Sequence, residues 1–317
     1  MAPFRIAIVG LGAIGTSIGL ALKQASTDIE IIGHDKDHTR AGAAAKRGAV
    51  NRADWNLISA CEDAEVIILA MPVSGIADTL KALAPYLTER NIVTDTASVK
   101  SPVMAWAAEH LPPAVSFVGG NPIIRRVAHG QEDADPNLFV NAVYCLTPAP
   151  SATPQALETV ADLVTALGAK PYFLDAAEHD GLIAAVGYLP FILAAILMLR
   201  VETSASHREL IRLSGVAFES AIDALGGDIS EKRDLCLLGK SNIARWLDAY
   251  MESLRDFREL LDRADGEALE TTFKTASEAR QKWLTGSDEG GIATDYSEFS
   301  LRQMLLGSAF RPPKSRK

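Results

Sequence analysis

The sequence predicts an α/β fold, with an N-terminal doubly wound parallel sheet followed by an all-α C-terminal domain. A glycine-rich turn joins an apolar run to a helical pattern close to the N-terminus. Short β-rich runs then alternate with helical repeats, as in a parallel sheet with crossover helices. From about Asp175 the strand patterns stop, and helical repeats with apolar faces and charged backs continue. We therefore expect a sheet domain in residues 1–175, a helical domain in 176–285 and an irregular tail in 286–317.

The first apolar run, residues 4–9, ends in the spacing G-x-G-x-x-G. Gly10 would allow the tight turn, Gly12 would let a pyrophosphate approach the backbone, and Gly15 would let helix and strand pack closely. The N-terminus of the following helix would direct free N–H groups and partial positive charge toward phosphates. A strand before the motif and a helix after it indicate a Rossmann-type dinucleotide-binding domain. The expected cofactor contacts in this turn are Gly10, Gly12, Ala13, Ile14 and Gly15.

An acidic residue, Asp35, follows the second predicted strand, residues 29–34. A carboxylate at this place accepts hydrogen bonds from the adenosine ribose and repels a 2′-phosphate. Lys36 and Arg40 lie nearby in the sequence and would offset part of that repulsion. We therefore expect NAD as the cofactor, with NADP less favoured.

Further strands and helices alternate after this unit. The expected strands are 65–70, 91–95, 116–119, 142–146 and 170–174. Residues 75–86 and 154–167 have the 3.6-residue apolar repeat of helices, and Gly168 is a candidate C-cap of the second. In the C-terminal half, the expected helices are 176–203, 207–226, 229–264 and 265–285.

Composition excludes several classes of protein. The 317 residues are 48% hydrophobic and 22% charged, as in soluble globular proteins of two domains. A net charge of -9 argues against a nucleic-acid partner. The three cysteines are isolated and show no metal-binding spacing, which favours a reducing, cytoplasmic location and no metal site. The N-terminus passes directly into a strand, so we expect no signal peptide.

The apolar stretch 182–199 contains no charged residue and is long enough to approach the width of a bilayer. Gly187 and Pro190 interrupt it, and Glu178 and Asp180 lie just before it. We therefore expect a helix buried in a helical core and a homodimer interface, not a membrane span.

Four segments are expected at the edge of the sheet where its strands end, which is where ligands of doubly wound sheets lie. The first, Met71, Pro72 and Val73, should line the cofactor. The next two are residues 94–100, which include Ser98, and residues 119–123, which include Asn121. The fourth, residues 178–180, contains His179 and opens the helical domain.

The motifs GLGAIGTSIGLALK, ILAMPV, DTASVK, GGNPI, LFVNAVYCLTP and EHDGLIAAVGYLPFILAA occur in this order. Together they resemble the prephenate/arogenate dehydrogenase family across residues 5–285. The resemblance implies an NAD(P)-dependent dehydrogenase of tyrosine biosynthesis that oxidises a small cyclohexadienol. In that reaction the carbinol hydrogen leaves as hydride, carbon dioxide is lost, and the ring becomes aromatic.

The chain departs from the family pattern at its site residues. Asn121 stands where the resemblance places a histidine that assists the reacting hydroxyl, and an amide cannot take its proton near neutral pH. Tyr188 and Phe191 replace two further histidines. Asp223 aligns, within one residue, with an arginine that binds the ring carboxylate. Arg125 and its neighbour Arg126 are candidates for a relocated anion site, although paired arginines are more often simply solvated.

Ser98 and His179 are retained from the family pattern, and we expect catalytic roles for Ser98, Asn121 and His179. Ser98 is also an expected cofactor contact, because its hydroxyl can hydrogen-bond either the reacting hydroxyl or the nicotinamide amide. Ser98 could instead be a helix N-cap, and His179 could cap the entrance of its helix. The expected substrate contacts are Asn121, Arg125, Tyr188, Phe191 and Asp223. Three hypotheses stay open: a dehydrogenase of the family's own substrates, an oxidoreductase of the same fold with a different substrate, and a cofactor-binding regulatory protein with little activity.

Overall fold

The computed structural model describes residues 3–124 and 130–285. The predicted anion-site residues Arg125 and Arg126 and the expected tail, 286–317, lie outside this described part of the chain. Within it, one compact unit reaches Ile243 and a second begins at Ala244. Every candidate site residue that can be placed belongs to the first of these two units.

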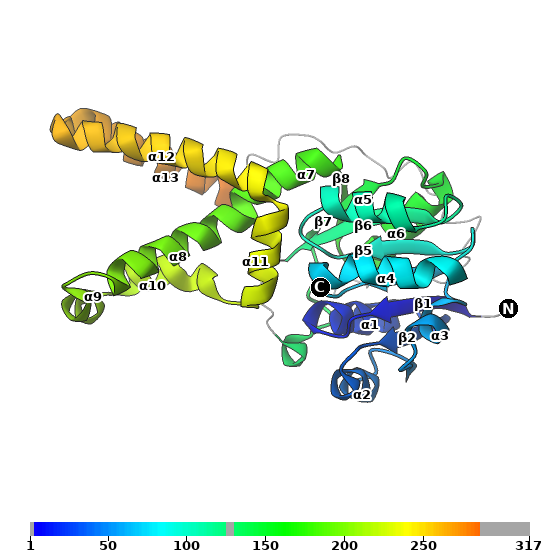
Figure 1. The fold of residues 1–317 in the computed structure, drawn as a ribbon. Helices are drawn as coiled ribbons and strands as arrows, with labels where there is room; N and C mark the ends of the chain where they lie inside the picture. The colour runs from blue at the N-terminus through cyan, green and yellow to red at the C-terminus, as the bar shows by residue number, and fades with distance from the viewer. Residues whose placement is uncertain (1–2, 125–129, 286–317) are drawn as a thin grey trace. The chain divides into compact units, whose positions relative to one another are not determined.

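The first unit is built around an eight-stranded sheet in the order β3-β2-β1-β4-β5-β6-β7-β8 (Figure 1). The chain reverses its direction of winding between β1 and β4, as a doubly wound fold requires. The strands are β1 (Phe4–Val9), β2 (Ile29–His34), β3 (Arg52–Ala53), β4 (Val66–Leu69), β5 (Ile92–Asp95), β6 (Ser116–Ile123), β7 (Val143–Pro148) and β8 (Lys170–Phe173).

The strand β6 differs from the expectation in length and in pairing. It continues four residues past the expected end at Gly119, and it pairs with β7 in antiparallel register, with Asn121 opposite Cys145. Its pairing with β5 reaches only Val118. Pro122, which has no N–H, is therefore tolerated where the strand has a single neighbour. As a result, Asn121 belongs to a strand and not to the loop that we expected.

Helices cover both faces of the sheet. One layer contains α1 (Ala13–Ala25), α2 (His38–Lys46) and α6 (Pro154–Ala166), whose apolar faces share a buried cluster with the strands. The other contains α3 (Leu57–Cys61), α4 (Ile76–Leu83) and α5 (Ser101–His110), which contact one another in sequence order. Gly168 ends α6 with a φ of 81°, the left-handed conformation expected of its C-cap.

After the sheet the described chain is helical. The long apolar stretch forms α7 (Ala176–Ile183), a single π-helical turn, η4 (Ala184–Tyr188), and α8 (Leu189–Glu202). By length and composition, residues 176–202 could cross a bilayer, and 28% of their most apolar 18-residue window is buried. The expected burial of this helix on all sides is therefore wrong for the isolated chain.

Two of the predicted helices are interrupted. Residues 207–226 form α9 (His207–Leu213), α10 (Val216–Ile222) and a 3₁₀ turn, η5 (Asp223–Leu225). Residues 229–264 form α11 (Ile229–Leu238) and α12 (Lys240–Asp262), and α13 (Gly266–Thr285) follows. Both interruptions occur at a glycine, Gly215 and Gly239, the residue with the lowest helix propensity after proline.

Candidate active site

The glycine turn between β1 and α1 leaves open space at one position only. Gly10 has a φ of 96°, and a β-carbon there would lie 2.4 Å from the Ala70 carbonyl oxygen. A β-carbon at Gly15 would lie 1.9 Å from the carbonyl oxygen of Gly10. A β-carbon at Gly12 would meet nothing within 4 Å. Gly10 and Gly15 are thus required by packing, whereas Gly12 keeps a free approach to the backbone.

The open approach at Gly12 leads to the N-terminus of α1. No side chain caps this helix, and its first turn contains no acidic residue. Its first N–H groups are therefore available to an anion, and the helix dipole favours negative charge there. Ala13 and Ile14 lie in that first turn, as the sequence predicts. These features fit the pyrophosphate of a dinucleotide.

Asp35 lies beside this turn, just beyond the end of β2. One of its carboxylate oxygens accepts a hydrogen bond from the N–H of Leu11 at 2.7 Å, and the other accepts one from Asp37 at 2.8 Å. The nearby Arg40 pairs with Asp37 at 3.6 Å and not with Asp35. The carboxylate of Asp35 is therefore fixed in position without a neutralising cation among its described contacts.

The segment after β4 continues the same sheet edge. Val73 is buried and starts the short 3₁₀ turn η1 (Val73–Gly75), while Met71 and Pro72 are more exposed. The sulfur of Met71 lies 3.5 Å from the Thr79 hydroxyl of α4. This edge is where the sequence predicts contact with the cofactor.

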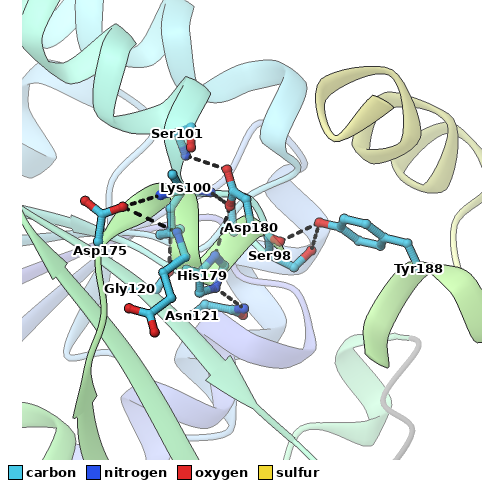
Figure 2. Close-up of polar contacts among 12 residues, drawn as sticks. Ser98, Lys100, Ser101, Gly120, Asn121, Asp175, His179, Asp180 and Tyr188 are labelled. Atoms are coloured by element: carbon cyan, nitrogen blue, oxygen red, sulfur yellow. Dashed lines mark hydrogen bonds and ion pairs between the residues drawn. The ribbon is translucent and has the colours of Figure 1, made fainter. Parts of the chain in front are cut away.

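A fully buried ion pair lies at the end of β5, beside Gly120 of β6. The ammonium group of Lys100 contacts the Asp95 carboxylate. It also donates a hydrogen bond to the Gly120 carbonyl oxygen at 2.6 Å (Figure 2). The N–H of Gly120 donates to the other oxygen of Asp95 at 3.1 Å. Burial lowers the pKa of Lys100, and its contacts with Asp95 oppose that effect. The pair holds Gly120, and with it the neighbouring Asn121, against β5.

The carboxylate of Asp180, on α7, organises the start of α5. It accepts hydrogen bonds from the backbone N–H groups of Lys100 at 2.6 Å and Ser101 at 2.8 Å, and from Nδ1 of His179 at 2.9 Å. Burial alone would raise the pKa of Asp180, but these hydrogen bonds outweigh it and the pKa is lowered. Asp180 therefore caps α5 from another helix, and Ser98 is not its N-cap.

The imidazole of His179 is fully buried between Asp180 and Asn121 (Figure 2). Its Nε2 lies 3.0 Å from the amide nitrogen of Asn121. Since the amide nitrogen can only donate, Nε2 is the acceptor and Nδ1 carries the proton that is donated to Asp180. The ring is thus fixed as one tautomer inside the fold and does not cap α7, whose N-cap is Asp175.

The π-helical turn η4 positions Tyr188. The N–H of Leu189 bonds to the carbonyl oxygen of Ala184, five residues earlier, and Pro190 supplies no N–H for the next bond. The phenolic hydroxyl of Tyr188 donates to the carbonyl oxygen of Ser98 and lies 3.3 Å from its Oγ (Figure 2). Burial raises the pKa of Tyr188, so it is a neutral hydrogen-bond donor.

The structure therefore brings together four of the predicted site residues, Ser98, Asn121, His179 and Tyr188. Phe191 is half-buried, and its ring packs under the ammonium group of Lys232, 4.9 Å from the ring centroid. Asp223 is exposed on η5, and no polar contact among the described residues joins it to this group. The set can orient a hydroxyl group through Ser98 and Asn121, with a buried imidazole and carboxylate behind the amide.

Sequence reasoning placed Asp95, Lys100 and Asp180 in segments at the sheet edge but predicted no role for any of them. The positions of Asp95 and Lys100, on either side of Ser98, could have predicted their ion pair. Opposite charges that follow a buried strand pair with each other when they are themselves buried. Asp180 gave no such signal, since its partners Lys100 and Ser101 lie about 80 residues away in the sequence.

Two sequence models of known families match the chain. The nucleotide-binding domain of prephenate dehydrogenase matches residues 18–173, and the dimerization domain of prephenate dehydrogenase matches residues 175–275. The prephenate dehydrogenase of Bacillus subtilis is 32% identical over 277 residues, which are 87% of this chain and 75% of that protein. The cyclohexadienyl dehydrogenase of Zymomonas mobilis is 28% identical, over 90% of this chain and 97% of that protein.

Solved structures show the same architecture. The arogenate dehydrogenase of Synechocystis has a TM-score of 0.76 at 27% identity and covers 88% of this chain and 99% of its own. The prephenate dehydrogenase of Aquifex aeolicus, solved with hydroxyphenyl propionate and NAD+, has a TM-score of 0.83 at 24% identity. That alignment covers 89% of this chain and 99% of the Aquifex chain.

Proposed function

The chain belongs to the prephenate dehydrogenase family, and we propose that it oxidises a 4-hydroxycyclohexadiene of the prephenate or arogenate type with NAD. Membership confirms the fold class and the family that the sequence predicts. The proposed place of the reaction is tyrosine biosynthesis, in the cytoplasm. The observation that carries the proposal is the convergence of Ser98, Asn121 and His179 at the edge of a dinucleotide-binding sheet (Figure 2).

The turn between β1 and α1 supports NAD as the cofactor. The space at Gly12, the uncapped start of α1 and the carboxylate of Asp35 together suit a pyrophosphate and an unphosphorylated ribose. The structure of the Aquifex relative was solved with NAD+. When bound, NAD would accept the hydride from the carbon that carries the substrate hydroxyl.

Asn121 and Ser98 would orient the reacting hydroxyl. One amide N–H of Asn121 donates to His179, which leaves its second N–H and its carbonyl oxygen for hydrogen bonds with the substrate. In this reaction the carbinol C–H bond would break and its electron pair would leave with the hydrogen as hydride. The C–C bond to the ring carboxylate would break to release CO₂, and the electron pair of that bond would complete the aromatic ring. The amide of Asn121 cannot take the hydroxyl proton as a histidine would, and loss of a general base lowers rates by about 10²–10⁴.

Turnover of prephenate is therefore expected to be poor. The decisive experiment is NADH formation at 340 nm with prephenate and arogenate in parallel, using wild type, Asn121→His, Asp223→Arg and the double variant. We expect Asn121→His to raise kcat for either substrate. Wild-type kcat/KM for prephenate within the usual range of about 10⁴–10⁸ M⁻¹s⁻¹ would contradict this reading of Asn121.

The same experiment distinguishes the proposed function from the other two hypotheses. A cofactor-binding regulatory protein would bind NADH but reduce no NAD with either compound. A dehydrogenase with a different substrate would also be silent here, yet would form NADH with another hydroxylated ring compound. Tight NADH binding together with turnover of arogenate or prephenate supports the proposed function.

We also propose that the chain forms a homodimer through its helices. The matching dimerization-domain model spans residues 175–275. Large apolar side chains on α8, α9 and α11 are exposed in one chain, among them Leu199, Leu213 and Leu237. A second copy would cover this surface without a membrane, since exposed patches of this kind are rare in monomeric soluble proteins.

A further inference from the structure

The helix α11 lies against two parts of the candidate site. It packs on η1, which follows β4 at the cofactor edge. At its C-terminal end, a β-carbon at Gly239 would lie 3.3 Å from the ring of Tyr188. Tyr188 in turn contacts Ser98. The helix therefore borders the region in which a substrate next to Ser98 and the cofactor would lie.

The first turn of α11 carries a half-buried cation. The ammonium group of Lys232 lies 4.9 Å from the centroid of the Phe191 ring. Phe191 stands three residues after Tyr188, so the two side chains project from neighbouring positions of one helical face. No described residue forms a salt bridge with Lys232. The aromatic ring supports this charge but does not neutralise it.

The preceding residue, Glu231, carries the opposite charge. Its side chain is half-buried, and burial together with Asp228 and Asp234 raises its pKa. Its charge also acts on the hydroxyl of Tyr188. Of its acidic neighbours, Asp228 caps α11 and Asp234 pairs with Arg233 at 2.7 Å. Glu231 itself has no ion pair among the described residues.

The carboxylate of Glu231 and the ammonium group of Lys232 lie near each other but form no salt bridge. Lys232 lowers the pKa of Glu231, so their charged groups are close enough to interact. They form no ion pair, which places the ammonium nitrogen and the carboxylate oxygens more than 4 Å apart. A gap between opposite charges near Phe191 and Tyr188, the second of which contacts Ser98, suits a ligand that itself carries both charges.

We propose that Glu231 and Lys232 recognise the ammonium and carboxylate groups of a zwitterionic amino-acid side chain on the substrate, which presupposes the dehydrogenase function proposed above. Arogenate carries such a group, whereas prephenate carries a keto acid at the same place. Lys232 would bind the carboxylate in both compounds. Glu231 would bind only the ammonium group, which the keto-acid side chain lacks. The enzyme therefore prefers arogenate.

The test compares kcat/KM for arogenate and prephenate in wild type, Glu231→Gln and Lys232→Met. Glu231→Gln should lower kcat/KM for arogenate about 10-fold and change that for prephenate less than twofold, because only arogenate loses a charged partner. Lys232→Met should lower both about 10- to 100-fold, mainly through KM. Glu89→Gln and Lys81→Met, which alter exposed residues of the sheet domain, are the matched controls and should change neither.

A direct binding measurement tests this proposal independently of the proposed reaction. In the presence of NAD+, calorimetry compares L-tyrosine with 3-(4-hydroxyphenyl)propionate, which lacks the amino group. Wild type should bind L-tyrosine about 10-fold more tightly, and Glu231→Gln should abolish that difference. An equal affinity for both ligands, or a preference that survives Glu231→Gln, overturns the site even if the enzyme is active. If the enzyme shows no turnover but still prefers L-tyrosine in a way that depends on Glu231, the proposed reaction is wrong and the proposed binding site stands.

Discussion

The sheet and the helices that follow it bury their apolar side chains to very different degrees. All four residues of β4 and the last four of β1 are buried, as expected of parallel strands covered on both faces. In α8 the outward positions include Leu199, which is 59% exposed, and in α9 Leu213 is 81% exposed. The second unit, described by itself, likewise exposes Trp283 on α13.

This difference shows which part of the molecule buries its apolar side chains within a single chain. The sheet domain has its own core, and its buried charges are paired within the same chain. The helical part has apolar surface that its own chain does not cover. Changes inside the sheet should therefore act at every protein concentration, whereas changes on the helices should act through association.

Breaking the buried ion pair of the sheet should have the largest effect. Lys100→Met leaves the Asp95 carboxylate buried without its cation, which costs about 3–5 kcal/mol of unfolding free energy. Urea unfolding followed by circular dichroism measures this loss, and it should not depend on protein concentration. Lys100→Met combined with Asp95→Asn should recover a large part of it. A single variant as stable as wild type would show that the pair does not hold the sheet edge.

The next effect separates packing from binding within the glycine turn. Gly12→Val should leave the fold intact, because a β-carbon there meets nothing within 4 Å, but its side chain enters the approach to the backbone. We expect NADH affinity to fall about 100-fold, or about 2.7 kcal/mol. Gly42→Val, on α2 and equally free of close atoms, is the control and should bind NADH normally. Equal affinities would remove Gly12 from the cofactor site.

A smaller effect tests the junction of the two regions. Asp180→Asn weakens three hydrogen bonds and should cost about 1–3 kcal/mol of stability at pH 7. The folded pKa of Asp180 lies below the unfolded value of about 3.9. Its contribution is therefore complete above that value and is lost as the pH falls toward the folded pKa. Stability measured from pH 7 downward should therefore differ less between wild type and variant as the pH falls below about 3.9, and a constant difference would contradict this.

Local patterns predicted most of the sheet region. The apolar runs, the glycine spacing and the turn residues predicted β1 and β2 with their observed bounds, and they indicated Gly168 as a helix C-cap. The antiparallel pairing of β6 with β7 was missed, because the sequence of a strand does not determine whether its neighbour runs parallel or antiparallel to it. The helical breaks at Gly215 and Gly239 were also missed, since the flanking apolar repeats continue across both glycines.

The candidate site was predictable where its residues follow strands. Ser98 and His179 were expected at the sheet edge because of their positions in the chain. The orientation of Tyr188 was not predictable, since it depends on the π-helical turn before Pro190. The contact of Asn121 with His179 joins a strand to a helix 58 residues later, and no local pattern encodes it.

The smallest expected change tests the uncovered helices themselves. Leu199→Ala removes apolar surface from the outward face of α8, and each dimer loses it twice. We expect the dissociation constant of the dimer to rise about 10-fold, or about 1.4 kcal/mol, with little change in the sheet. Light scattering over a dilution series measures this. Tyr86→Ala, which removes an exposed aromatic ring from the sheet domain, is the control and should leave association unchanged. If wild type stays monomeric at micromolar concentration, the apolar helices need another cover, and partition of the protein into lipid vesicles would then identify it as a membrane.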